Sequence, residues 1–161
     1  MEKTRVTSNP PRGALRIGLR LPIWLYRLHL GWLLGTRFLL LSHVGRSSGR
    51  IHQTVIEVVK HDRASNSFFV VSGWGDKADW FQNIHKNPHV IIESGGHILQ
   101  AQADDIPFDE AIDILNEYTH RYPIAFKELT ALFLGERMQP GPDASRRLAE
   151  KMPMVVFRPR Q

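Results

Sequence analysis

Short β-type segments separated only by turns fill the middle of this chain, and they constrain its fold more than any other feature. Apolar and β-branched residues dominate each segment, and polar or glycine-rich stretches end it. We expect strands at 37–44, 51–59, 68–71, 89–93, 97–103 and 154–157. The segments at 89–93 and 97–103 flank Gly95-Gly96, which suits the tight turn of a hairpin.

Helical periodicity is confined to the spaces around these strands. A short helix is expected at 79–85, because Pro88 disfavours helix at the residue before it. Longer helices are expected from Phe108 to Tyr122 and at 124–134, whereas 135–143 has the composition of a loop. Consecutive strands with few helices between them favour an antiparallel meander or barrel over a doubly wound sheet. The predicted fold class is therefore α+β.

The basic charge of the chain is concentrated at its N-terminus. Of 161 residues with a net charge of +5, the first 37 hold seven basic side chains and one acidic. We therefore divide the chain into a basic amphipathic segment or helix at 1–36 and one domain at 37–161. The segment interleaves arginines with apolar residues and two tryptophans, Trp24 and Trp32. This composition fits a helix packed on its own domain or on a dimer mate, and equally one lying on an anionic membrane through residues 12–34.

Several functional classes are excluded by composition. The chain has no cysteine, which rules out thiol catalysis and cysteine-ligated zinc. Basic charge confined to one apolar-rich segment fits nucleic-acid binding poorly. Arg20 and Arg27 interrupt any secretory apolar region, so we expect a cytoplasmic protein. His85 and His89 are four residues apart, but Pro88 lies between them, and we predict no metal site.

The turn Gly45-Arg-Ser-Ser-Gly-Arg50 offers two guanidinium groups, two hydroxyls and backbone N–H groups. These groups bind phosphates and carboxylates, although the same residues also suit a plain polar hairpin turn. Ser72-Gly-Trp-Gly75 follows a predicted buried strand. Its glycines and tryptophan could meet a flat ligand or could simply end the strand. Trp80 and Asn83 share a helix face, where the amide of Asn83 must find polar partners.

Taken in order, these motifs resemble the deazaflavin (F420)-dependent nitroreductase family. The resemblance rests on 39–50, 69–73, 79–84, 87–90, Gly95-Gly96 and 153–159, and it is best over residues 35–105. It implies a split β-barrel of about six mainly antiparallel strands with flanking helices, of the FMN-binding split-barrel type. It also implies a homodimer that binds F420 and moves hydride to a small apolar, aromatic or quinone-like acceptor.

The resemblance assigns residues to the cofactor in three groups. The turn after the first strand would meet the phosphate and acidic tail, the segment after the third strand would meet the deazaflavin ring, and the following helix would complete the pocket. The implied residues are Arg46, Ser47, Ser48, Gly49 and Arg50, then Ser72, Gly73, Trp74 and Lys77, then Trp80 and Asn83.

Two departures from the family pattern keep alternatives open. Ser47 replaces a basic residue, and Ile51-His52 replaces a Pro-Arg pair, so that His52 could supply charge only when protonated. FMN, which has no glutamate tail, is thus the alternative cofactor. A non-enzymatic flavin or lipid binder at the membrane is the alternative function. Since no tyrosine follows Tyr122, the candidate proton donors are Tyr118, Tyr122 and His43.

Overall fold

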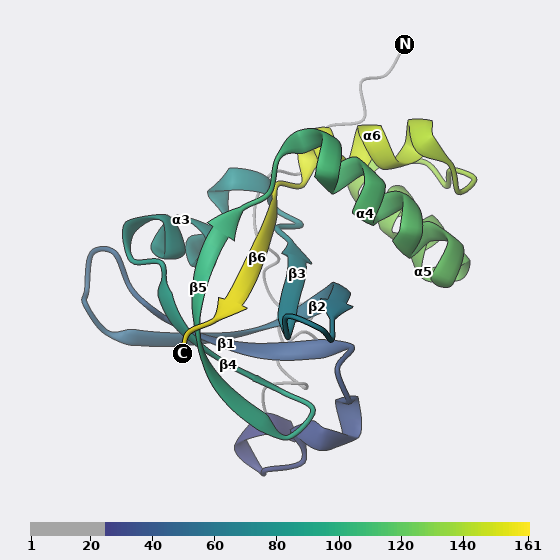
Figure 1. The fold of residues 1–161 in the computed structure, drawn as a ribbon. Coiled ribbons are helices and arrows are strands. Elements are labelled where there is room, and N and C mark those ends of the chain that lie inside the picture. Colours follow the sequence, from purple (N-terminus) through teal and green to yellow (C-terminus); the bar gives the residue numbers. More distant parts are fainter. Residues whose placement is uncertain (1–24) are drawn as a thin grey trace.

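Six strands close into a β-barrel in the computed structural model, which describes residues 25–161. The order around the barrel is β1-β2-β3-β6-β5-β4, and all neighbouring pairs are antiparallel. The strands are β1 (Phe38–Val44), β2 (Ile51–Asp62), β3 (Ser67–Val71), β4 (His89–Ser94), β5 (His97–Asp105) and β6 (Met154–Pro159). Figure 1 shows them enclosing one interior. The predicted α+β class and antiparallel barrel are confirmed.

β2 is longer than predicted, because the strand continues past Val59 to Asp62. Its pairing with β3 shifts register between Val58 and Lys60, which marks a β-bulge. A bulge bends a strand and increases its twist, so β2 can follow the curve of the barrel without ending. The turn that follows is stabilised by Asp62, whose carboxylate accepts hydrogen bonds from Ala64 N and Ser65 Oγ at 3.0 and 2.6 Å.

The barrel interior is one apolar cluster built from alternate strand positions. Leu39 and Leu41 of β1 are fully buried, and Ile56 and Val58 of β2 belong to the same cluster. Side chains two residues apart point to the same face of a strand, so His43 continues the inward series of Leu39 and Leu41. A polar residue therefore occupies the inward position near the end of β1, where α3 packs against the strand.

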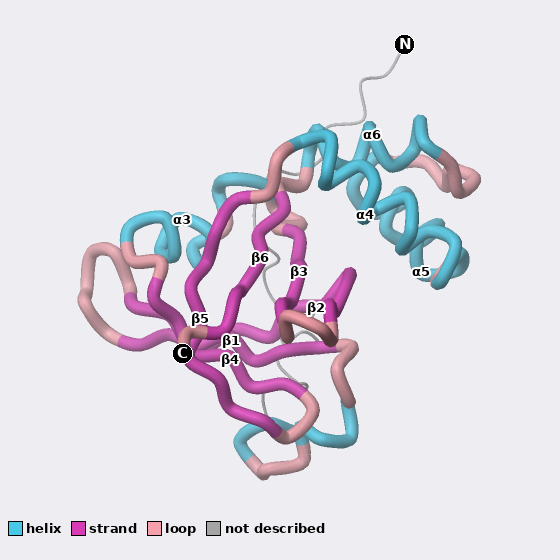
Figure 2. Tube along the Cα trace, viewed as in Figure 1, coloured by secondary structure: helices cyan, strands magenta, loops and turns pink. Residues whose placement is uncertain are grey.

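Helices cover two parts of the barrel. The 3-10 helix η2 (Gly75–Lys77) and α3 (Asp79–Lys86) follow β3, and α3 packs against β1. α4 (Phe108–Arg121), α5 (Pro123–Leu134) and α6 (Pro142–Lys151) pack together beside β3 and β6, as Figures 1 and 2 show. Their shared apolar cluster includes outward residues of the barrel such as Val59, Phe69 and Val156. The helices predicted at 79–85, 108–122 and 124–134 are confirmed, whereas α6 was not predicted.

The basic amphipathic segment or helix predicted at 1–36 lies mostly outside the described residues. Its described end contains the 3-10 helix η1 (Gly31–Leu34). Tyr26 fastens this segment to the barrel, since its hydroxyl donates to Phe38 O at 3.1 Å. Gly95 N also donates to Gly35 O at 3.0 Å, which ties the segment to the β4–β5 turn. Within residues 25–161, no helix has the length and apolar character needed to span a bilayer.

Candidate functional site

A cavity of about 880 Å³ lies along one side of β2, and we call it the β2 cavity. β2 lines it from His52 to Glu57 and again at Val59. The turn after β1 and the start of α3 contribute polar residues at the His52 end. Helix α5 and the segments after β3 and α6 contribute apolar ones. The other lining residues are Phe38, His43, Gly45, Arg46, Ser47, Ser48, Val71, Gly73, Trp74, Ala78, Asp79, Trp80, Asn83, Leu129, Leu132, Phe133 and Met152.

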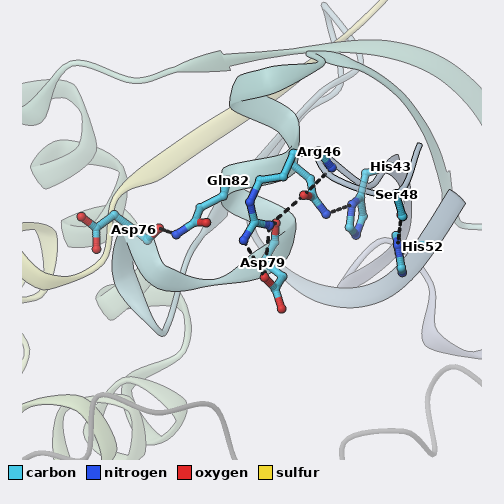
Figure 3. A network of polar contacts seen from close by, with 8 residues as sticks. His43, Arg46, Ser48, His52, Asp76, Asp79 and Gln82 are labelled. Carbon is cyan, nitrogen blue, oxygen red and sulfur yellow. Dashed lines mark hydrogen bonds and ion pairs between the residues drawn. The ribbon is translucent and has the colours of Figure 1, made fainter. Parts of the chain in front are cut away.

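Arg46 organises the polar end of the β2 cavity. Its guanidinium group donates to Asp79 Oδ1 at 3.1 Å and to Asn83 Oδ1 at 2.9 Å. Its backbone N–H donates to the same Asn83 oxygen at 3.0 Å. Asp79 and Asn83 are four residues apart on α3, so both face the turn. Figure 3 shows this network, which joins two segments 37 residues apart in the sequence.

His43 lies at the inner side of this network and is only 4% exposed. Asn83 Nδ2 lies 3.1 Å from His43 Nδ1, and the His52 ring stacks on His43 at a centroid distance of 5.9 Å. Burial, and then the nearby His52, lower the pKa of His43 from 6.5 to about 4, although Asp79 opposes the shift. Protonating this ring would place a charge in a poorly solvated position beside His52. His43 is therefore neutral at pH 7.

The turn between β1 and β2 leaves hydrogen-bond donors open at the cavity. Gly49 N donates to Gly45 O at 2.9 Å, and the positive φ of 67° at Gly49 closes the turn in a conformation that favours glycine. Among the described residues, the N–H groups of Ser47 and Ser48 have no acceptor. Successive unpaired N–H groups in a turn form a concave site that attracts anions. This supports the anion-binding interpretation of the turn.

The apolar end of the β2 cavity is built by α5 against the segment after β3. The rings of Trp74 and Phe133 meet edge to face at 6.0 Å. A Cβ atom at Gly73 would lie 2.7 Å from Cζ of Phe133, so a larger residue here would force the Phe133 ring to move. The absent side chain of Gly73 thus makes room for helix α5, and not only for a ligand as the sequence suggested.

Most of the residues assigned to the cofactor lie around this one cavity. Its lining includes Arg46, Ser47, Ser48, His52, Gly73, Trp74, Trp80 and Asn83. Gly49, Arg50, Ser72 and Lys77 lie outside the lining. Ser72 is buried and its hydroxyl donates to Gly75 O at 2.6 Å, so it shapes the loop after β3. Arg50 and Lys77 are exposed.

Of the three candidate proton donors, only His43 lines the cavity. Tyr118 is a buried residue of α4 and donates to Glu57 Oε1 at 2.9 Å. Burial and the Glu57 carboxylate raise the pKa of Tyr118 above its usual range, which opposes loss of its proton. Tyr122 lies under the guanidinium group of Arg37, 5.2 Å from its centre.

Sequence reasoning missed the contributions of β2 beyond His52 and of α5. β2 lines the cavity with consecutive residues from His52 to Glu57, so both faces of the strand contribute, and the two-residue period of a strand does not indicate this. α5 is apolar around most of its circumference, and this composition pointed to a helix with more than one buried or lining face. In residues 25–161, no group of three His, Asp or Glu side chains could hold a metal ion.

Comparisons with solved structures support the fold. The chain is similar to an F420-H2 dependent reductase, FDR-A, at 17% identity and a TM-score of 0.50, over 75% of this chain and 93% of that one. A structure described as a domain-swapped dimer matches at 17% identity and a TM-score of 0.53, over 89% and 99%. A conserved hypothetical protein from Mycobacterium tuberculosis matches at 14% identity and a TM-score of 0.52, over 84% of this chain and 80% of that one. No curated protein matches the chain.

A family model describes the chain more specifically than these distant structures do. The model of the F420H(2)-dependent quinone reductases matches residues 20–128, which include five of the six strands, the Gly45–Arg50 turn, α3 and α4. The match covers well over half of the chain and contains the whole polar end of the β2 cavity. The chain therefore belongs to the F420H(2)-dependent quinone reductase family, and it is an oxidoreductase that uses F420.

Proposed function

We propose that the β2 cavity is the site where this enzyme binds F420 and a quinone-like acceptor. The observation that carries the proposal is the joining of two surfaces in one cavity: unpaired N–H groups at the Gly45–Arg50 turn, and aromatic and aliphatic side chains near α5. Ligand sites of this kind combine an apolar lining with a few polar groups that fix orientation. When bound, reduced F420 supplies a hydride to the acceptor.

The residues at the turn fit an anionic group. The N–H groups of Ser47 and Ser48 would bind a phosphate oxygen. Arg50 and Lys77 are exposed outside the lining and would add positive charge from there. Neither of these two cations forms an ion pair within residues 25–161. Arg46 contributes less net charge than the sequence suggested, because Asp79 lies 3.1 Å from its guanidinium group. Its main contribution is to hold α3 against the turn.

The apolar lining supports an acceptor with a flat, weakly polar ring. Trp74, Phe133 and Leu132 can cover such a ring and exclude water from it. Trp80 packs against the apolar cluster of the barrel interior and would support the cavity from the barrel side. Exclusion of water strengthens every hydrogen bond in the site and limits loss of hydride to solvent.

Binding of the cofactor is tested by fluorescence titration with F420 and, separately, with FMN. Arg50→Ala should weaken F420 binding about two- to fivefold at low salt, because Arg50 is exposed outside the cavity lining and would act on an anion at the turn through its charge. Arg63→Ala is the matched control, because Arg63 is also exposed but lies in the β2–β3 turn and not in the Gly45–Arg50 turn. Equal effects of the two variants, or FMN binding more tightly than F420, would contradict the assignment.

The acceptor site is tested by oxidation of reduced F420 with a naphthoquinone. Leu132→Asp places a charge in the lining and should raise the KM for the quinone about tenfold, since an unpaired charge is costly near an apolar ligand. Ile124→Asp is the control, because Ile124 is exposed on the same helix but does not line the cavity. A KM that rises equally in both variants would argue against an acceptor at α5.

A second proposal concerns the surface around η1, where we infer peripheral membrane contact. Leu28, Trp32 and Leu33 are 64%, 60% and 57% exposed, and Arg27 and Arg37 flank them. Exposed apolar side chains among basic residues favour an anionic lipid surface. Trp32→Ser should reduce sedimentation with phosphatidylglycerol vesicles, and Ile124→Ser should not. Equal sedimentation of both variants would refute the contact. The homodimer and the cytoplasmic location stay predictions.

A further inference from the structure

The hydrogen bonds around Asn83 determine which way its amide faces. Arg46 N and Arg46 Nη1 lie 3.0 and 2.9 Å from one end of the amide. Both Arg46 groups are donors only, so the atom that they meet must be the oxygen, and two donors occupy its two lone pairs. The NH₂ group of Asn83 then faces His43 Nδ1 at 3.1 Å.

The orientation of Asn83 in turn sets the tautomer of His43. An amide NH₂ group only donates, so Nδ1 of His43 must accept, and the ring proton resides on Nε2. Nε2 forms no hydrogen bond within the described residues and is not among their enclosed, unpartnered atoms. Because the ring lines the β2 cavity and is otherwise buried, the Nε2–H group can be reached only from that cavity.

The charged and titratable groups around His43 come from three elements. Arg46 lies on the turn after β1, His52 on β2, and Asp79 at the start of α3. Burial and His52 outweigh Asp79 and lower the pKa of His43 to about 4. The ring therefore stays neutral throughout the ordinary working range of pH. It can donate a hydrogen bond there, but it is a poor source of a proton.

We propose that Asn83 is a positioning residue that holds His43 in the neutral Nε2–H tautomer, and that this N–H group donates to a carbonyl oxygen of a molecule bound in the β2 cavity. The identity of that molecule rests on the proposed function, since both a deazaflavin ring and a quinone carry carbonyl oxygens. On a quinone, a donor fixed in this way stabilises the negative charge that develops on the oxygen as the hydride adds. On the deazaflavin, which is oxidised in this step, it orients the ring. The proposal replaces the proton-donor interpretation of His43 with a hydrogen-bonding one.

The tautomer is tested directly by ¹⁵N-edited NMR of the histidine rings at pH 7. The wild-type ring of His43 should show a protonated Nε2 and an unprotonated Nδ1. Asn83→Asp keeps an oxygen toward Arg46 but presents only acceptors to His43, so the proton should move to Nδ1 and the pKa of His43 should rise. Gln82→Glu is the matched control, because Gln82 lies beside Asn83 on α3, contacts Asp76 O and does not line the cavity. A protonated Nδ1 in the wild type would overturn the proposal.

The hydrogen bond to a ligand is tested by adding F420 or 2-methyl-1,4-naphthoquinone and following the Nε2–H signal of His43. A shift with F420 alone identifies the cofactor as the acceptor of the bond, and His43→Phe should then raise the Kd for F420 three- to tenfold. A shift that appears only with the quinone identifies the substrate. His43→Phe should then lower kcat/KM for the quinone by a similar factor and leave the F420 Kd unchanged.

The two proposals fail in distinguishable ways. If F420 binds but neither ligand shifts the Nε2–H signal, the donor assigned to His43 is wrong and the cofactor site remains. If F420 does not bind while the quinone shifts the signal, the cofactor site is wrong and the donor remains. A fold check by circular dichroism accompanies each variant, so that loss of structure is not mistaken for loss of a hydrogen bond.

Discussion

The two ends of the β2 cavity are built on different physical principles. At the polar end, Arg46, Asp79, Asn83 and His43 are linked by directional hydrogen bonds, so each side chain has one orientation. At the apolar end, Leu129, Leu132 and Phe133 of α5 offer surface without direction. The polar end can therefore select and orient a ligand, whereas the apolar end can accommodate ligands of different outline. Under the proposed function, the polar end would orient the cofactor and the apolar end would cover the ring of the acceptor.

The largest expected effect comes from disrupting the buried cluster that holds α5, the helix at the apolar end. Phe126 of α5 is fully buried among α4 and α6. Phe126→Ala should lower the free energy of unfolding by about 3–5 kcal/mol, because it leaves a cavity in a packed cluster. Urea denaturation measures the change. Leu132→Ala, on the same helix but 62% exposed, should cost far less, and similar losses for both would show that α5 is not held by this cluster.

The polar end should be sensitive to acid. His43 has a pKa of about 4 when folded, against 6.5 without burial, so below pH 6.5 the unfolded chain takes up a proton that the folded chain does not. The free energy of unfolding should therefore not be reduced by His43 above pH 6.5, and it should fall by about 3 kcal/mol between pH 6.5 and pH 4. Urea denaturation at several pH values should show a shallower fall for His43→Gln. His97→Gln is the control, because His97 is exposed. If the unfolding free energy of His43→Gln fell with pH as steeply as that of the wild type, His43 would not be the group responsible.

His85 should affect stability in the opposite direction to His43 as the pH changes, because folding raises its pKa instead of lowering it. Burial by itself lowers the pKa of His85, but hydrogen bonds to Phe81 O and to Asp105 at 2.9 Å raise it overall. Its contribution to stability is therefore present below pH 6.5 and is lost as the pH rises through the raised value. Asp105→Asn should remove that contribution. NMR titration of His85 should then show a lower pKa, and an unchanged titration would mean that Asp105 does not pair with it.

A moderate effect is expected where the two sides of the apolar end meet. Gly73→Ala should destabilise the protein by about 1–2 kcal/mol, since the new methyl group would lie 2.7 Å from the Phe133 ring. Phe133→Leu leaves room for that methyl group, so the double variant should lose less than the sum of the single variants. A double-mutant cycle in urea measures the coupling. If the losses of the two single variants simply added up in the double variant, the Phe133 ring would be able to move away from the added methyl group at little cost.

The smallest expected effect comes from adding charge to the polar end. Ser47→Lys places a cation beside the unpaired N–H groups of the turn and should tighten F420 binding by about 0.5–1 kcal/mol at low salt. The gain should shrink near 0.15 M salt, where the Debye length is about 8 Å. Gln100→Lys, exposed on β5 and outside the cavity lining, should leave the affinity unchanged. An equal gain in that control would indicate a general charge effect.

The sequence predicted the features that depend on local rules. Runs of apolar and β-branched residues, ended by polar or glycine-rich stretches, located all six strands, and Pro88 marked the end of α3. The polar turn was recognised because its chemistry lies within six consecutive residues. Its link to Asn83 could not be predicted, because that contact exists only once α3 packs on β1.

The apolar end was harder to predict for a different reason. α5 lacks a clear polar face, so its periodicity did not show which residues would line a cavity. α6 was missed although it carries both signals of a helix, Pro142 in the first turn and buried Ala144, Ser145 and Leu148 at helical spacing. The loop predicted at 135–143 overlaps the first two residues of α6, and no element was predicted for 144–151.

The barrel closes, but one stretch of strand edge in it has no partner strand. β2 pairs with β1 over residues 51–57, whereas it pairs with β3 only between Val58 and Asp62. Among the described residues, the edge of 51–57 that faces away from β1 is therefore unpaired, and unpaired strand edges can bind further extended chain. Because this same stretch of β2 lines the β2 cavity, a ligand in the cavity would also shield the edge from another chain.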